Sequence, residues 1–240
     1  MSDRETCLVM ADVLIHTNKY EEMVSYMKKI VDANPQLSAK ERTYLVFAYK
    51  NIITPRRQGI RYLITSIEDG SDEHVINEFR KQKIHETKEI MAKELNQYST
   101  ELIELIDHKI LPVTTEPESI VFYGKLKGDY YRYLCEAAED QERDSYQKLA
   151  TESYEKAFEL CQKDLKPFEP TSLGLVLNYS VFLFEIIQDK QKAIDLAKKA
   201  LEESTPLIDQ NSENSLHEVK EIMSRLGDNI NLWQSSIQEE

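Results

Sequence analysis

One segment of this chain, YKNIITPRRQGIR, carries three basic side chains at spacings typical of a single helix face. At 100° per residue, Lys50, Arg57 and Arg61 fall within about 40° of one another. Pro55 precedes the arginines and is a residue type that can kink a helix. The spacing predicts a basic stripe along a helix.

A second basic segment, KLKGDYYRYL, contains Lys125 and Arg132 seven residues apart on one helix face, with Tyr133 one step round. Asp129 lies between them, placed to hold Arg132 by an i, i+3 contact. Guanidinium, ammonium and phenol groups converging from the two segments would offer charge-assisted, partly bidentate hydrogen bonds to an oxyanion. A phosphate, with about −1.5 to −2 charges near neutral pH, suits that set.

The same charges have a simpler interpretation, in which they form solvated faces that pair with the many acids of the chain. Asp129 and Glu136 lie on the same stripe as Arg132, which favours this interpretation. Spacing alone leaves both interpretations open.

Two further stripes mix polar with apolar side chains. In the apolar segment GLVLNYSVFLFEII the stripe is formed by Gly174, Asn178, Val181 and Glu185. Near the C-terminus it is formed by Ile222, Arg225, Asn229 and Trp233. An unpaired Asn or Glu in a core costs about 1 to 3 kcal/mol, so the first stripe is expected either to face a groove or to hold a satisfied core pair.

No catalytic or metal-binding motif is found in the sequence. Five scattered histidines, with no His-Glu-x-x-His pattern and no glycine-rich phosphate loop, are His16, His74, His85, His108 and His217. No nucleophile can be paired with a base. Cys7, Cys135 and Cys161 lack the paired spacing of a disulfide framework or zinc site, which fits a reducing cytoplasmic or nuclear setting. We expect no enzyme activity, no cofactor and no metal.

Composition limits the partners. The 240 residues include 41% hydrophobic ones, and 43 acidic against 30 basic residues give a net charge of −13. Such a charge argues against nucleic acid or anionic membrane as the main partner. The N-terminus lacks the pattern of a secretory signal, and GLVLNYSVFLFEII is shorter than the roughly 20 residues of a membrane span. A soluble protein is expected.

Helical periodicity dominates the chain and predicts an all-α fold of about nine antiparallel helices in one domain over residues 1–235, with a short tail at 236–240. Expected breaks between helices are Thr17–Lys19, Ser38–Arg42 (a capping box with Glu41), Asp69–Asp72, Pro112–Pro117, Ala138–Arg143, Lys166–Pro170, Gln188–Lys190 and Pro206–Glu213. SYEKAFEL and KAIDLAKKALEES resemble tetratricopeptide helices, but no period of about 34 residues runs through the chain.

Five segments closely resemble signature segments of 14-3-3 proteins, and they occur in the same order and at similar distances. They are YKNIITPRRQGIR, VFYGKLKGDYYRYL, SYEKAFEL, PTSLGLVLNYSVFLFEII and GDNINLW. The similarity extends over nearly the whole chain and is weakest at about residues 62–98. It implies a nine-helix protomer whose concave groove binds phosphoserine or phosphothreonine peptides, usually within a dimer.

The resemblance assigns roles by position. The phosphate ligands would be Lys50, Arg57, Arg132 and Tyr133, with Arg61 and Lys125 nearby. Asn178 and Asn229 match asparagines that bond the peptide main chain, and Glu185 and Trp233 match groove residues that pair with each other and with the peptide. The apolar lining would be Leu177, Val181, Ile222 and Leu232.

The chain departs from the family pattern at several positions. Glu221 and Arg225 replace aliphatic wall residues, at a spacing that allows an i, i+4 ion pair, and Gly227 replaces an arginine. Lys19, Tyr20, Glu22 and Glu94 match residues of the family's dimer contact. At that contact Thr87 and Ile90 replace a tyrosine and a lysine, so we expect a homo- or heterodimer with a weakened or rearranged contact.

The resulting hypothesis is an adaptor that binds phosphorylated client proteins. The alternative is a helical-repeat scaffold that binds unphosphorylated peptides and retains only the fold. A helical hydrolase is disfavoured by the missing catalytic groups.

Overall fold

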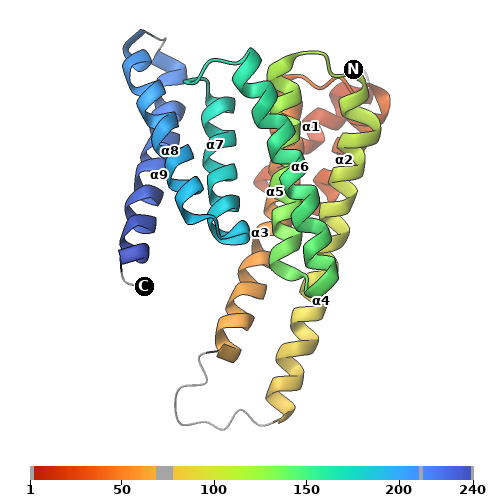
Figure 1. Ribbon diagram of the computed structural model, residues 1–240. Helices are drawn as coiled ribbons and strands as arrows, with labels where there is room; N and C mark the ends of the chain where they lie inside the picture. Colours follow the sequence, from red (N-terminus) through yellow and green to blue (C-terminus); the bar gives the residue numbers. More distant parts are fainter. Residues whose placement is uncertain (1–2, 69–77, 211–212, 239–240) are drawn as a thin grey trace. The chain divides into compact units, whose positions relative to one another are not determined.

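The computed structural model describes residues 3–68, 78–210 and 213–238, and within these ranges the regular structure is entirely helical (Figure 1). The described residues form nine α-helices: α1 (Asp3–His16), α2 (Tyr20–Ala33), α3 (Ala39–Glu68), α4 (Glu78–Leu105), α5 (Pro117–Ala137), α6 (Asp140–Asp164), α7 (Pro170–Phe182), α8 (Lys190–Ser204) and α9 (Glu213–Gln238). Short π-helical turns are η1 (Ile106–Ile110) and η3 (Leu183–Ile187), and short 3-10 turns are η2 (Leu111–Val113) and η4 (Thr205–Gln210). The predicted all-α class is confirmed.

Most of the expected breaks fall between the observed helices. The residues Thr17–Lys19, Ala138–Arg143 and Gln188–Lys190 each contain a helix boundary, and each of these boundaries has a residue with positive φ: Asn18, Asp140 and Gln188. The break expected at Asp69–Asp72 lies outside the described residues. Pro55 lies inside α3 and does not end that helix.

The described residues group into two compact units. Unit 1 comprises residues 1–114 and 136–140, and unit 2 comprises residues 115–135 and 141–240. The expectation of a single domain over residues 1–235 stays a prediction.

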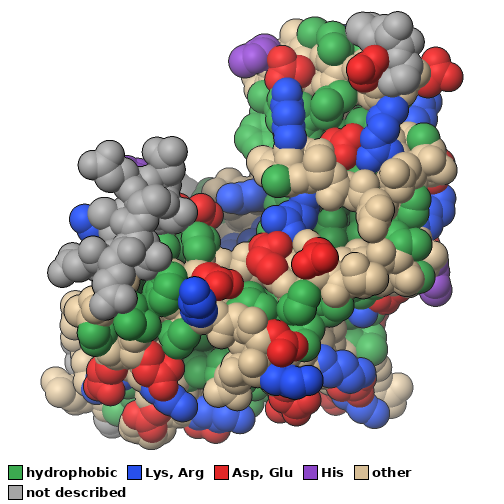
Figure 2. Space-filling view, turned by 90° about the horizontal axis from the view of Figure 1, so that it is seen from above, with side chains coloured by type: hydrophobic (Ala, Val, Ile, Leu, Met, Phe, Trp, Pro, Cys, Tyr) green, Lys and Arg blue, Asp and Glu red, His purple; other side chains and the backbone are tan. Residues whose placement is uncertain are grey.

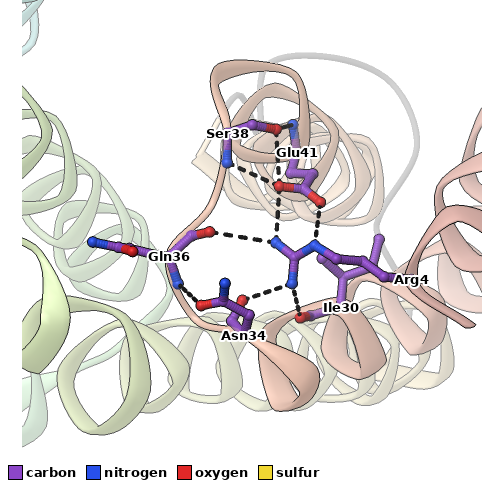
Figure 3. Close-up of polar contacts among 6 residues, drawn as sticks. All are labelled: Arg4, Ile30, Asn34, Gln36, Ser38 and Glu41. Atoms are coloured by element: carbon purple, nitrogen blue, oxygen red, sulfur yellow. Dashed lines mark hydrogen bonds and ion pairs between the residues drawn. The ribbon is translucent and has the colours of Figure 1, made fainter. Parts of the chain in front are cut away.

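In unit 1, Arg4 joins the start of α1 to the connection between α2 and α3 (Figure 3). Its guanidinium binds both carboxylate oxygens of Glu41, at 2.8 and 2.9 Å, and donates to the carbonyl groups of Ile30 and Asn34 at 2.8 and 2.9 Å. Those carbonyls end α2, where a positive charge is favourable. Arg4 therefore fixes three helices with one side chain.

Glu41 also completes the predicted capping box at the start of α3. Its carboxylate accepts from the backbone N–H and the hydroxyl of Ser38, both at 2.8 Å, and the Ser38 hydroxyl accepts from the Glu41 N–H at 3.4 Å. Burial opposes the ionisation of Glu41, but the hydrogen bonds from Arg4 and Ser38 outweigh it and lower the pKa of this carboxyl group. The predicted start of α3 is confirmed.

The core of unit 2 is built around aromatic rings from α6 and α7. Tyr154 stacks on Tyr179 at a centroid distance of 5.4 Å and lies 5.2 Å from Phe182. The Tyr154 ring also packs directly on Gly128 of α5, where an added Cβ would lie 2.8 Å from the ring. The glycine of the GDYYRYL segment is thus required for the close approach of α5 and α6.

The apolar helix of unit 2 extends beyond the segment GLVLNYSVFLFEII, which was expected to be too short for a membrane span. Because η3 continues α7, the helix runs over 18 residues, Pro170–Ile187, and its length and composition would suffice to cross a membrane. Half of this segment is buried, and α7 packs against both α8 and α9, beside which it lies in Figure 1. The core helix of a soluble protein has the same properties, so this feature alone is weak support for a membrane span.

Candidate functional site

The α3 basic group, defined as Lys50, Arg57 and Arg61, belongs to unit 1. Arg57 donates to both carboxylate oxygens of Glu136, at 3.0 and 2.8 Å, and Arg61 lies 3.0 Å from one of them. The Glu136 side chain is 11% exposed, against 17% for Arg57 and 52% for Arg61. One nearly buried carboxylate therefore holds two guanidinium groups together, with bidentate geometry at Arg57.

Two other cations of α3, Lys50 and Arg56, do not bind Glu136. Lys50 is exposed, and among the described residues it forms no ion pair. Arg56, next to Arg57, pairs instead with Glu94 at 2.9 Å and Glu21 at 3.6 Å. The two adjacent arginines thus serve separate acidic partners, and only Arg57 joins the group predicted from spacing.

The α5 basic group, defined as Lys125, Arg132 and Tyr133, belongs to unit 2 and is largely buried. Arg132 is only 6% exposed, and its guanidinium carbon lies 4.8 Å from the centre of the Tyr133 ring. Its Nε donates to the Tyr154 hydroxyl over a long 3.5 Å. Arg132 is therefore not part of a solvated face, which rules out that interpretation for this residue.

The counter-charge in unit 2 is Asp129, which is 3% exposed. Its carboxylate accepts from the Lys125 ammonium at 2.9 Å, from the Tyr154 hydroxyl at 2.6 Å, and from the Asn178 amide at 2.8 and 2.9 Å. Three elements, α5, α6 and α7, thus meet at one carboxylate. A buried charge requires this degree of hydrogen bonding.

This network sets the pKa of Asp129 and of Tyr154. Burial would raise the pKa of Asp129, but the charges of Lys125 and Arg132 outweigh it and hold the pKa below its ordinary value. Burial and the neighbouring Asp129 charge raise the pKa of Tyr154 well above its ordinary value. At neutral pH the carboxylate is ionised and the phenol is protonated, so Tyr154 is the hydrogen-bond donor to Asp129.

The first mixed stripe meets this network at Asn178. Leu177, Asn178 and Val181 are half-buried on α7, whereas Glu185 is exposed in η3. The Asn178 Nδ2 is used by Asp129, and its Oδ1 has no hydrogen-bond partner within the part of the chain that the structure describes. A peptide N–H is the kind of donor that this carbonyl oxygen can accept.

The second mixed stripe lies on α9, where its members differ in exposure. Leu232 is 67% exposed and Arg225 is exposed, whereas Ile222 and Asn229 are half-buried. Trp233 is only 5% exposed and stacks on Phe184 at a centroid distance of 4.7 Å. Trp233 therefore belongs to the core of unit 2, and a peptide contact at this residue stays a prediction.

The spacing on α9 allows an ion pair that is not formed within the described residues. Glu221 and Arg225 are both exposed, and neither takes part in an ion pair among the described residues. An exposed i, i+4 pair contributes little to stability, so its absence costs the helix little.

The structure groups the predicted site residues by unit. In unit 2 it brings Lys125, Arg132 and Asn178 together around Asp129, and in unit 1 it brings Arg57 and Arg61 together around Glu136. Spacing within one helix could not show that Glu136 is the shared partner of two arginines more than seventy positions away. Over the face seen in Figure 2, acidic and basic side chains are likewise interspersed.

No cluster of three or more possible metal ligands occurs among the described residues.

Comparisons with known proteins agree with the segments described above. The family model for 14-3-3 protein matches residues 10–234. The chain is 38% identical to 14-3-3 protein 3 of Entamoeba histolytica, with 99% of this chain and 98% of the relative covered. It is 36% identical to 14-3-3 protein beta/alpha of Homo sapiens, with 98% and 94% covered, and 36% identical to 14-3-3 protein beta/alpha-A of Xenopus laevis, with 99% and 96% covered.

Proposed function

The chain belongs to the 14-3-3 family of adaptor and regulatory proteins, and on that premise we propose that it binds phosphoserine or phosphothreonine segments of client proteins. The observation that carries the proposal is the cluster around Asp129. Within unit 2 it joins Lys125 and Arg132, predicted beside the phosphate, to Asn178, predicted at the peptide main chain.

Each member of this cluster has a distinct role in the proposal. Arg132 provides a cation that is held in position by burial and by the Tyr133 ring, so little side-chain entropy is lost when a phosphate binds. The Tyr133 hydroxyl adds a hydrogen bond to the same phosphate. Asn178 uses its amide nitrogen for Asp129 and offers its Oδ1 to a peptide N–H.

The proposal also assigns the α3 basic group to phosphate binding, following the family resemblance. Arg57 and Arg61 share Glu136, so a phosphate must compete with that carboxylate for their hydrogen bonds or share them with it. A phosphate carries about −1.5 to −2 charges against one for a carboxylate, which favours the phosphate in this competition. Glu136 then keeps the guanidinium groups oriented when no ligand is bound.

The alternative function is a helical scaffold that binds unphosphorylated peptides. One short peptide with a single serine, prepared with and without the phosphate, separates the two functions by fluorescence anisotropy. The proposal predicts that the phosphorylated form binds about tenfold tighter or more, because losing one partner of a desolvated charge pair costs about 2 to 5 kcal/mol. Equal affinities would favour the scaffold.

Family membership implies protein partners and dimerisation in general, and we propose a homodimer for this chain. The predicted contact residues are partly occupied inside the protomer: Glu94 binds Arg56 at 2.9 Å, and Lys19 lies 3.4 Å from Glu22. Exposed apolar side chains of α1 and α4 in unit 1 are available to replace the lost polar contacts, namely Val9, Val13 and Ile90. Sedimentation showing only a monomer at micromolar concentration would refute the dimer.

A further inference from the structure

We propose that a pocket between α6, α7 and α8 binds a small, neutral and mainly apolar molecule that carries one hydrogen-bonding group. All residues of this pocket belong to unit 2, and none belongs to either basic group. The inference goes beyond the proposed function and does not depend on phosphopeptide binding.

The size and walls of the pocket fit such a molecule. Its volume is about 320 Å³, at the small end of the roughly 300 to 1,000 Å³ typical of ligand sites. The apolar lining consists of Phe158, Leu165, Pro167, Val176, Leu196 and Ala200. A hollow with mainly apolar walls gives few partners to water, so filling it with an apolar ligand is favourable.

One polar group in the pocket, the Ser172 hydroxyl, has only the weakly hydrogen-bonding Cys161 thiol beside it. Ser172, in the first turn of α7, lines the pocket and is only 3% exposed, and its Oγ forms no hydrogen bond of acceptable geometry among the described residues. A buried hydroxyl that forms no hydrogen bond of good geometry destabilises the folded state. A ligand hydroxyl or carbonyl group would relieve that cost, which points to one polar group on the ligand.

The neighbouring thiol supports a non-covalent ligand. Burial raises the pKa of Cys161, and this effect is only partly offset by the nearby Ser172 hydroxyl. The thiol is therefore protonated at neutral pH and is a poor nucleophile. It acts as a soft apolar wall, and its slow reaction with thiol reagents gives a probe for occupancy.

The charges at the rim favour a neutral ligand. Lys199 and Glu203 both line the pocket and lie 3.7 Å apart on α8, so they largely cancel each other. An adjoining hollow shares Phe158, Leu196 and Lys199, but its other lining residues are mostly charged, and it lacks a buried polar group without a partner. The pocket at Ser172 is therefore the site for the apolar molecule.

Benzyl alcohol and toluene test the proposal, because they differ only by a polar group. We expect saturable binding of benzyl alcohol to the full chain in ligand-observed NMR. Ser172→Ala should lower the ratio of benzyl alcohol to toluene affinity about fivefold, the effect of one net hydrogen bond. An unchanged ratio would overturn the role of Ser172, and no saturable binding of either compound would overturn the site.

A second variant and a second readout keep the test independent of folding. Ala200→Met fills the pocket and should abolish binding of both compounds, whereas Lys192→Ala, in the adjoining hollow, should leave it unchanged. In the parent protein, benzyl alcohol should slow alkylation of Cys161 but not of Cys7, followed by mass spectrometry. An alkylation rate at Cys161 that does not respond to benzyl alcohol would contradict the proposal even if Ala200→Met does not fold.

Discussion

The α3 and α5 basic groups solve the same problem, holding cations close together in an acidic protein, in different ways. In unit 2, Arg132 is 6% exposed and its counter-charge Asp129 receives hydrogen bonds from α5, α6 and α7. In unit 1, Arg57 and Arg61 share the carboxylate of Glu136, and Arg61 is 52% exposed. The α5 basic group is therefore part of the core of unit 2, whereas the α3 basic group lies nearer the surface of unit 1.

This difference should appear first in stability. Asp129→Ala leaves buried cations without their partner, a change that costs about 3 to 5 kcal/mol. The free energy of unfolding, measured by urea denaturation, should fall by that amount. Asp164→Ala, at the exposed end of α6, is the matched control and should change it by less than about 0.5 kcal/mol. A cost for Asp129→Ala no larger than that of the control would mean that the buried network is not stabilising.

The pH dependence of stability tests whether the charge of Asp129 stabilises the fold. Since the pKa of Asp129 is lowered from 3.8 in the folded state, its ionised form stabilises the fold fully above pH 3.8. That contribution is lost as the pH falls through the folded pKa. The advantage of the parent over Asp129→Asn should thus be constant from about pH 5 to pH 7 and shrink in stronger acid. An advantage that persists unchanged in acid would show that the charge of Asp129 is not responsible.

Removing the charge of Glu136 should lower the free energy of unfolding by less than removing Asp129 does. Glu136→Gln weakens the charge-assisted hydrogen bonds of Arg57 and Arg61, so the loss should not exceed about 1.5 to 3 kcal/mol. The cations it leaves are more accessible to water than Arg132 is. Glu152→Gln, whose partner Lys156 lies 3.9 Å away on the surface of α6, is the control and should be nearly neutral. If Glu136→Gln destabilises as much as Asp129→Ala, the contrast between the two groups is wrong.

The smallest effect on stability is expected for the altered wall positions of α9. Glu221 and Arg225 are exposed and form no ion pair with each other, so replacing both by leucine should change the free energy of unfolding by less than about 0.5 kcal/mol. If they face the ligand, the double variant should prefer phosphopeptides with apolar residues beside the phosphoresidue. Identical ranking of a phosphopeptide library by parent and variant would show that these positions do not contact the ligand.

Local sequence signals predicted much of the fold. The capping box at Ser38 and Glu41 is a contact within one turn, and its residue types are specific, so the start of α3 could be predicted. The π-helical turns η1 and η3 could not, because no residue pattern distinguishes them from the α-helices they continue. The expected breaks at Lys166–Pro170 and Gln188–Lys190 did bound the whole apolar helix, but only its inner segment GLVLNYSVFLFEII was compared with the length of a membrane span.

Site prediction from spacing succeeded within helices and failed between them. The spacing of Lys125, Asp129 and Arg132 placed these residues on one face of α5. It could not reveal that Tyr154 and Asn178 reach the same carboxylate from other helices, or that Arg57 binds Glu136. The pocket at Ser172 could not be predicted either, because it forms between helices and because an absent hydrogen bond leaves no signal in a sequence.

Arg132, although buried in an ion network, is proposed to serve the ligand as well as the fold. The most direct test is the affinity of one peptide, phosphorylated and unphosphorylated, for the parent, Arg132→Ala and Arg132→Lys, each first shown to be folded by circular dichroism. We predict that Arg132→Ala weakens binding of the phosphorylated form about tenfold or more and leaves the unphosphorylated form unchanged, with Arg132→Lys between them. A folded Arg132→Ala protein that keeps the parent's preference for the phosphate would contradict the claim and leave Arg132 with a structural role alone.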